Sequence, residues 1–154
     1  PMNAFYVLQG IETLSLRMKK HMENTKEMLD FLSNHEAVSW VKHPDLKSHP
    51  DHHIAKRILS KGSGSVIVFG LKGGRDAGKA FIESVQLSSH LANVGDAKTL
   101  LIHPGSTTHS HLSSQAMRSA GLTDDLIRLS VGLEDIDDIK KDFEMGFKSI
   151  LKTK

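Results

Sequence analysis

The chain of 154 residues contains no cysteine. Disulfide bonds, thiolate nucleophiles and zinc sites built from cysteine are therefore excluded. The absence is compatible with a reducing compartment, and we expect a cytoplasmic protein. In other respects the composition is ordinary for a globular protein, because 38% of the residues are hydrophobic and 25% are charged. The length is enough for one domain with a sizeable core.

The sequence also lacks an excess of charge of one sign and a long apolar run. Its 20 basic and 18 acidic residues are interspersed and give a net charge of +2, so no basic stripe indicates a nucleic-acid partner. The apolar residues that open the chain are too few to span a membrane and have no basic flank. We expect neither a signal peptide nor a transmembrane helix. Pro1 in the first position fits a chain that begins inside a longer one.

Residues 4–32 are predicted to form one long helix. Its second half carries an apolar stripe that contains Met18, Met22, Leu29 and Leu32. Its first half is apolar on nearly every side, through Phe5, Tyr6, Val7, Leu8, Ile11, Leu14 and Leu16. A helix of that kind must be buried on every side, which fits a position between two domains or subunits. The alternative is a central helix in a single core.

The remaining sequence predicts an α+β domain. Short apolar runs with β-branched residues predict strands at residues 38–41, 65–71, 99–103 and 127–131. Helical spacing of apolar residues predicts helices at residues 53–59, 76–92 and 135 to about 151. We expect a mixed or antiparallel sheet of about four strands, with helices packed mainly on one face.

Four histidines lie between residues 43 and 53, together with two prolines and two aspartates. They lack the i, i+4 helical spacing and the paired ligand arms of structural zinc sites. A surface loop is therefore the preferred interpretation, with a metal site as the alternative, and we expect no metal. The acidic cluster at residues 134–138 does not follow calcium-loop spacing, and it suits the positive end of the following helix dipole.

Arg128 stands inside an apolar strand. The period of two in a strand places Arg128 and Ser130 on the face opposite Ile127, Leu129 and Val131, so the guanidinium points away from the core. An arginine in this position needs an anion. From spacing alone, the simpler interpretation is a solvated residue on the open face of an antiparallel sheet.

Two segments resemble the C-terminal domain of the pyridoxal-phosphate enzymes of cysteine and methionine metabolism. They are GDAKTLLIHP at residues 95–104, followed by STTH at residues 106–109, and IRLSVGLEDIDD at residues 127–138. The segment LANVGD at residues 91–96, together with STTHS at residues 106–110, is most similar to the O-acetylhomoserine sulfhydrylase branch. The resemblance runs almost from end to end.

The resemblance implies the small C-terminal domain of a fold-type-I enzyme, with residues 1–33 as an interdomain helix and residues 34–154 as the domain. It implies a reaction in which O-acetylhomoserine loses acetate and gains sulfide or methanethiol, to give homocysteine or methionine. The family places its cofactor on a lysine in a Ser-x-Thr-Lys context in an N-terminal domain, and this context does not occur here. We therefore expect no catalytic residue in the fragment, no cofactor bound by it alone, and no turnover without its N-terminal partner domain. The family is typically homotetrameric.

The resemblance assigns substrate-binding roles to three residues. Arg128 matches the arginine that clamps the substrate α-carboxylate, Asn93 matches a polar position that holds the same group, and Thr108 matches a threonine that lines the pocket. Gly105 departs from the pattern, because the family has alanine there. Alternatives are a related methionine γ-lyase or cystathionine γ-synthase, a non-catalytic module that binds carboxylates, and an assembly domain in which Arg128 is an ordinary surface residue.

Overall fold

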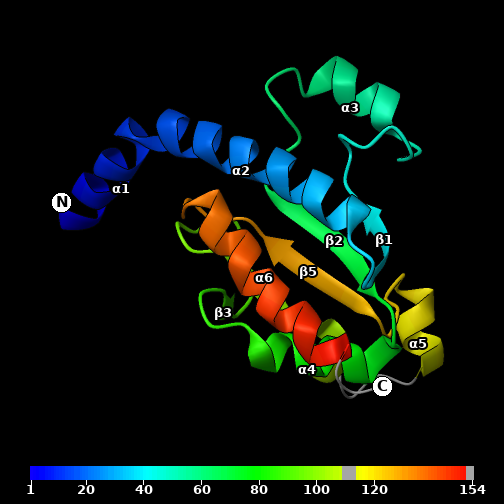
Figure 1. The fold of residues 1–154 in the computed structure, drawn as a ribbon. Coiled ribbons are helices and arrows are strands. Elements are labelled where there is room, and N and C mark those ends of the chain that lie inside the picture. The colour runs from blue at the N-terminus through cyan, green and yellow to red at the C-terminus, as the bar shows by residue number, and fades with distance from the viewer. Residues whose placement is uncertain (109–113, 152–154) are drawn as a thin grey trace.

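One mixed β-sheet organises the chain, with its strands in the order β1-β2-β5-β4-β3 (Figure 1). The computed structural model describes residues 1–108 and 114–151, so His109 of the first motif lies outside the described residues. The strands are β1 (Val38–Lys42), β2 (Val66–Leu71), β3 (Ser89–His90), β4 (Leu100–Ile102) and β5 (Leu126–Ser130). The helices are α1 (Met2–Glu12), α2 (Leu14–Asn34), α3 (His52–Ile58), α4 (Gly74–Ser84), the 3-10 helix η1 (Pro104–Ser106), α5 (Ser114–Ser119) and α6 (Ile136–Leu151).

The predicted α+β class is confirmed, and the sheet has one strand more than expected. Strand pairs β1–β2, β2–β5 and β5–β4 are antiparallel, whereas β3 runs parallel to β4. The additional strand, β3, has only two residues and therefore gives no periodic signal in the sequence. All four predicted strands are present within about two residues of their expected ends.

The sheet has two chemically different faces. Ile127 and Leu129 of β5 lie on one face with their cross-strand partners Phe69 and Ile67, and all four side chains are fully buried. Arg128 lies on the other face, because successive residues of a strand point to opposite sides. The alternation that the sequence predicts for β5 is therefore confirmed.

Three helices cover the apolar face, as Figure 1 shows for α2, α6 and α4. Their buried residues form one core with the strands, and the largest of them are phenylalanines. Phe69, Phe81, Phe143 and Phe147 pack with ring centroids 5.1–6.3 Å apart. Each buried ring contributes about 1.5–3 kcal/mol relative to an exposed one, so this cluster is a major stabilising element.

The prediction of a single helix over residues 4–32 is wrong, because α1 and α2 are separated at Thr13. Gly10, a weak helix former, precedes the break. The guanidinium of Arg17 donates a hydrogen bond to the Gly10 carbonyl and another, of 3.3 Å, to the Thr13 hydroxyl. The bond to Gly10 satisfies a carbonyl of the last turn of α1, where helical donors are missing.

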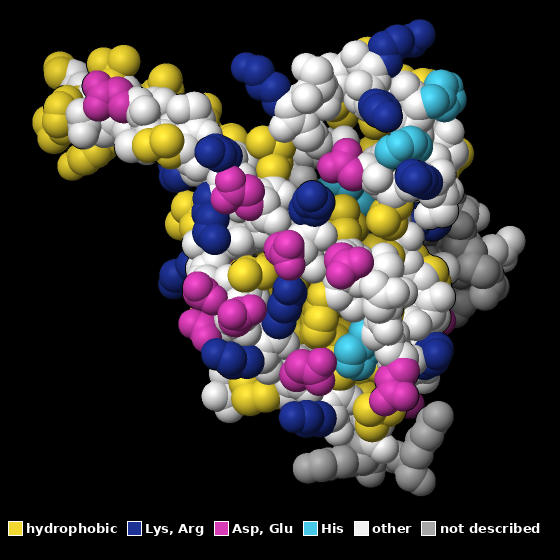
Figure 2. Space-filling view, turned by 45° about the horizontal axis from the view of Figure 1, so that its top comes forward, with side chains coloured by type: hydrophobic (Ala, Val, Ile, Leu, Met, Phe, Trp, Pro, Cys, Tyr) yellow, Lys and Arg dark blue, Asp and Glu magenta, His cyan; other side chains and the backbone are white. Residues whose placement is uncertain are grey.

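Helix α1 extends away from the body of the protein as an arm with an apolar surface (Figures 1 and 2). None of its residues is buried, and Phe5 and Leu8 are 52% and 60% exposed. The alternative of a central helix in a single core is therefore wrong. Among the residues that the structure describes, none buries the apolar side chains of this arm, which leaves them available to a partner.

The apolar stripe predicted for the second half of the helix over residues 4–32 is confirmed only in part. Leu29 and Leu32 of α2 belong to the core, but Met18 and Met22 are only half-buried. The other buried positions of α2 include three polar residues, His21, Asn24 and Thr25. The apolar stripe did not indicate them, because His21 and Asn24 are buried through hydrogen bonds to backbone more than 100 residues away, and the Thr25 hydroxyl donates to the His21 carbonyl.

Helix α4 ends at Ser84, eight residues before the predicted end at Ala92. The carboxylate of Asp142, on α6, accepts hydrogen bonds from the backbone N–H groups of Gln86, Leu87 and Ser88, at 2.6, 2.9 and 2.9 Å. These three groups would bond to carbonyls of the preceding turn if the helix continued. The contact with α6 therefore ends α4 despite the helical spacing of the sequence.

The segment between residues 43 and 51 consists mainly of turns and leads into α3. His43 is buried, and its pKa is lowered mainly by burial, against the opposing effect of the Asp45 charge. Among the described residues, no group of three or more histidine, aspartate or glutamate side chains is arranged to hold a metal ion. Across residues 1–108 and 114–151, no helix has the length and apolar character needed to cross a membrane.

Candidate functional site

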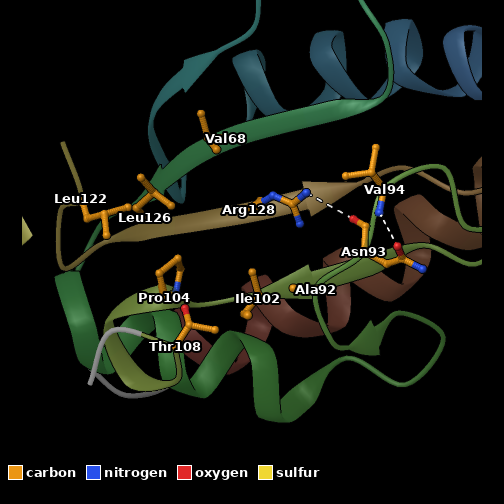
Figure 3. A pocket seen from close by; sticks show the side chains of 10 residues that line it. All are labelled: Val68, Ala92, Asn93, Val94, Ile102, Pro104, Thr108, Leu122, Leu126 and Arg128. Atoms are coloured by element: carbon orange, nitrogen blue, oxygen red, sulfur yellow. Dashed lines mark hydrogen bonds between the residues drawn. The ribbon is translucent and has the colours of Figure 1, made fainter. Parts of the chain in front are cut away.

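A pocket of about 500 Å³ opens on the sheet face that the three helices leave uncovered (Figure 3). It includes Arg128, Asn93 and Thr108, the three residues to which the family resemblance assigns substrate binding. Its ten lining residues are Val68, Ala92, Asn93, Val94, Ile102, Pro104, Thr108, Leu122, Leu126 and Arg128. Most of the lining is apolar, and Arg128 is the one charged residue in this set.

Arg128 lies in the middle of β5, which is itself the middle strand of the sheet. Its cross-strand neighbours are Val68 on one side and Ile102 on the other, so two apolar side chains flank the base of the arginine. The side chain is half-buried. Because the flanking groups cannot hydrogen-bond, an anion at the guanidinium would meet little competition from protein groups.

The guanidinium forms one described hydrogen bond, from Nη2 to the backbone carbonyl of Asn93 at 3.2 Å (Figure 3). Within the described residues, Arg128 forms no ion pair. An arginine has five N–H donors in a planar fork. The remaining donors are chemically suited to a carboxylate or another planar anion.

Asn93 lines the pocket in a way that differs from the expectation. Its backbone carbonyl contacts Arg128, whereas its side chain bonds within its own loop. The Oδ1 atom accepts a hydrogen bond from Val94 N at 2.8 Å, and Nδ2 donates one to Asp96 Oδ2 at 3.2 Å. The pKa of Asp96 is lowered mainly by the backbone N–H of Lys98, and also by the Asn93 amide. The side chain would have to leave Asp96 to bind a ligand.

Thr108 is exposed at the rim of the pocket, after η1. The fully buried His103 ring fixes the start of this loop. Its Nε2–H donates to the Asp124 carbonyl at 2.8 Å, which leaves Nδ1 to accept from the Ser106 hydroxyl at 2.9 Å. His103 was predicted only as the end of a strand, and its role as a loop anchor has no signal in local sequence.

Gly105, where the family pattern has alanine, is buried beside the same ring. A Cβ atom there would lie 3.5 Å from His103 Nε2 and 3.5 Å from Met117 Cε, which is ordinary contact. Arg75 donates a hydrogen bond of 2.8 Å to the Gly105 carbonyl. The departure from alanine therefore removes a methyl group without changing a polar contact.

The apolar lining is the part of the site that sequence reasoning missed. Val68, Ile102 and Leu126 reach the pocket because they share a sheet face with Arg128. Alternation within each strand could have assigned them to that face, but only the register of three strands brings them together. Ala92, Pro104 and Leu122 come from connecting segments and had no comparable signal.

Comparisons with known proteins agree with this architecture. A family model described as Cys/Met metabolism PLP-dependent enzyme matches residues 1–148. Homocysteine synthase of Schizosaccharomyces pombe is 50% identical over 148 residues, which are 96% of this chain and 34% of that protein. O-acetyl-L-homoserine sulfhydrylase 1 of Thermus thermophilus is 48% identical over 144 residues, which are 94% of this chain and 34% of that protein. The chain thus spans about a third of the length of these curated relatives.

Solved structures extend the comparison to three dimensions. The O-acetylhomoserine (thiol)-lyase from Campylobacter jejuni, which contains a pyridoxyl-lysine phosphate, matches with a TM-score of 0.88 and 37% identity, over 97% of this chain and 35% of that one. The cystathionine gamma synthase of Xanthomonas oryzae matches with a TM-score of 0.90 and 34% identity, over 100% of this chain and 40% of that one. By sequence, the L-methionine gamma-lyase of Fusobacterium nucleatum is 42% identical over 150 residues, which are 97% of this chain and 38% of that protein. The family therefore includes several activities on related amino acids.

The pocket residues fit a small anionic group and do not fit the attachment of pyridoxal phosphate. No lysine occurs among the ten lining residues, and the sequence contains no Ser-x-Thr-Lys segment. The cofactor on which the family depends is held by a lysine in the Campylobacter structure. With its matching fold, its family-model match over residues 1–148 and its arginine-bearing pocket, the chain belongs to the pyridoxal-phosphate-dependent enzymes of cysteine and methionine metabolism.

Proposed function

We propose that the chain is the substrate-orienting C-terminal part of a sulfhydrylase that acts on O-acetylhomoserine. Sulfide would replace acetate at the γ-carbon to give homocysteine, or methanethiol would replace it to give methionine. Support comes from the sulfhydrylase relatives and from the Arg128 guanidinium, which lies in the pocket without an ion-pair partner among the described residues. That guanidinium is the observation on which the proposal rests.

In this proposal Arg128 binds the substrate α-carboxylate. Its planar fork matches the two carboxylate oxygens, and hydrogen bonds between charged groups are roughly twice as strong as neutral ones. Val68 and Ile102 place apolar side chains beside the base of the guanidinium, and an interaction between charges is stronger in apolar surroundings than in water. Thr108 lies at the rim, where its hydroxyl can contact the substrate. The cofactor, when bound by the rest of the enzyme, supplies the electron sink for the reaction.

The apolar arm fits the same arrangement. Residues 1–33 comprise two helices rather than the one expected, and we propose that α1 is the interdomain part, covered by the N-terminal cofactor domain or by a neighbouring subunit of a homo-oligomer. Its exposed large apolar side chains are Met2, Phe5, Tyr6, Val7, Leu8 and Ile11. A contiguous apolar surface of this kind is typical of an interaction site.

A related lyase activity is the second candidate, because an L-methionine gamma-lyase is 42% identical over 150 residues. Both activities bind an amino-acid carboxylate, so the Arg128 pocket suits either one. The distinction is measurable. A sulfhydrylase consumes O-acetylhomoserine only when a thiol is present, whereas a γ-lyase releases methanethiol from methionine.

The test is replacement of Arg128 in the complete protein that carries this chain. Loss of one partner of a desolvated charge pair costs about 2–5 kcal/mol, so Arg128→Ala should lower kcat/KM for O-acetylhomoserine by roughly 30-fold to several thousand-fold. Arg128→Lys should recover only part of the loss, because an ammonium lacks the fork.

Arg57→Ala is the matched control, because Arg57 lies on α3, outside the pocket. Thermal melts of all variants separate loss of binding from loss of folding. If Arg128→Ala keeps kcat/KM within about twofold of the parent, the carboxylate assignment fails and Arg128 is an ordinary residue of an open sheet face.

A further inference from the structure

Three residues join the end of β5 to the start of β4, and we call them the clasp: Thr99, Gly132 and Glu134. The Glu134 carboxylate accepts hydrogen bonds from Thr99 N at 2.6 Å and from Thr99 Oγ1 at 2.8 Å. The same hydroxyl accepts a hydrogen bond from Gly132 N at 2.9 Å. Thr99 is fully buried. Three hydrogen bonds therefore join the two segments, and the Thr99 hydroxyl serves as donor in one and as acceptor in another.

Gly132 allows the clasp to be this tight. A Cβ atom on Gly132 would lie 2.4 Å from Thr99 N and 2.5 Å from the carbonyl carbon of Lys98, both of which are backbone atoms. Backbone cannot move aside as a side chain can, so only glycine permits this approach. The distance between the two segments is set by direct backbone packing.

The clasp holds one end of the loop whose other end contacts Arg128. This loop, residues 93–98, connects Asn93 to the clasp at Thr99. Leu133 N donates a hydrogen bond of 2.8 Å to the Ala97 carbonyl, which adds a backbone tie beside the clasp. At the opposite end, the Asn93 carbonyl accepts the Nη2–H of Arg128 at 3.2 Å. The position of that carbonyl therefore depends on where the clasp holds the loop.

Helix α2 fixes the clasp from the other side. The buried Asn24 amide donates to the Gly132 carbonyl at 3.0 Å and to the Glu134 carbonyl at 2.9 Å. The buried His21 ring donates from Nδ1 to the Val131 carbonyl at 2.7 Å. His21 and Asn24, two of the buried polar residues of α2, thus anchor the backbone of residues 131–134.

We propose that Glu134 is a positioning residue for Arg128, acting through Thr99 and the loop of residues 93–98. The Asn93 carbonyl holds one edge of the guanidinium, which fixes the orientation of the fork and leaves its other donors toward the pocket. A fork held in the binding orientation loses less freedom when the carboxylate binds. Glu134 itself does not line the pocket, so its effect on the substrate is indirect. The proposal rests on the proposed role of Arg128.

The test is a double-mutant cycle in the complete enzyme, with Glu134→Ala made alone and in an Arg128→Ala background. In the parent background, Glu134→Ala should raise the KM for O-acetylhomoserine about tenfold, with a smaller change in kcat and no change in the KM for sulfide. In the Arg128→Ala background the same change should have no further effect on that KM, because the residue through which Glu134 acts is gone. Equal effects in the two backgrounds would overturn the positioning role.

Two further variants and one control keep the test decisive. Glu134→Gln retains one carbonyl acceptor for Thr99 N and should restore most of the affinity, whereas a merely electrostatic role would not be restored. If Glu134→Ala does not fold, Thr99→Val removes the bridging hydroxyl while keeping the backbone N–H, and it replaces Glu134→Ala in the cycle with the same expected outcomes. Phe147→Leu, in the helix-covered core, is the stability-matched control and should leave the KM unchanged.

The two proposals fail in different ways. If Arg128→Ala alone has no effect on catalysis, the carboxylate role of Arg128 fails, and the positioning role of Glu134 fails with it. If Arg128→Ala impairs catalysis but Glu134→Ala leaves the KM unchanged, or changes it equally in both backgrounds, only the positioning role fails.

Discussion

The hydrogen bonds to Asp142 allow a quantitative prediction about stability. Asp142 is only 2% exposed, and its carboxylate accepts three backbone N–H groups from the segment that follows α4. A hydrogen bond to a charged group contributes about 1.5–3 kcal/mol. Gln86 and Leu87 are exposed, so water can hydrogen-bond to their backbone N–H groups when the carboxylate is lost. Ser88 is buried, so its N–H group would stay without a water partner. We expect Asp142→Asn to cost about 2–4 kcal/mol.

The pH dependence of this effect has a definite sign. Burial alone would raise the pKa of Asp142, but the three backbone N–H groups outweigh it and leave the pKa below its usual value. A carboxyl with a lowered folded pKa contributes fully above its unfolded pKa, about 3.9, and the contribution is lost as the pH falls through the folded value. The stability difference between the parent and Asp142→Asn should be constant near neutral pH and shrink below about pH 4.

Urea unfolding followed by circular dichroism measures the difference. The free energy of unfolding falls by about 2 kcal/mol per molar urea, so a cost of about 2–4 kcal/mol lowers the urea concentration at the unfolding midpoint by roughly 1–2 M. Asp138→Asn on the same helix is the control, because its contact is an exposed ion pair with Lys141, and such pairs contribute little. A midpoint shift for Asp142→Asn no larger than that of the control would refute the account of how α4 ends.

Two other predictions concern close packing and the arm. Gly78→Ala should destabilise the protein by about 1–3 kcal/mol in thermal melts, because a Cβ atom there would lie 2.7 Å from Nε2 of the buried His103. Gly105→Ala is the control and should change stability by less than about 0.5 kcal/mol, because its Cβ atom would make only ordinary contacts. Equal effects of the two substitutions would contradict this reasoning. The 154-residue chain should associate in a concentration-dependent way in sedimentation, because α1 exposes apolar side chains, and the double substitution Phe5→Glu, Leu8→Glu should abolish the association. A parent chain that stays monomeric across the concentration range would count against an uncovered arm.

The fold was predictable where local pattern and tertiary structure agree. The alternation around Arg128 gave the correct face, and the apolar spacing of α6 gave the correct helix. The end of α4 was not predictable, because it depends on Asp142, which lies 54 to 56 residues away in sequence. The burial of Asn24 has the same character, since its partners are more than 100 residues distant. Spacing reports local periodicity and contains no information about such pairs.

The candidate site was predictable in its polar part and not in its shape. Arg128, Asn93 and Thr108 were named from motifs, and the structure brings all three to one pocket. The part of Asn93 that reaches Arg128 is its backbone carbonyl, which every residue type possesses. No residue pattern could therefore have indicated that contact.

The separation of the two sheet faces has a consequence for how this protein can change. Even-numbered positions such as Val68 and Leu126 shape the pocket, whereas their odd-numbered neighbours Phe69 and Ile127 belong to the core. Substitutions at the first set alter what the pocket accepts while the packed interior keeps its volume. If the pocket binds substrate as proposed, its preferences can be selected or engineered on this scaffold in small steps, while the core that holds the fold stays unchanged.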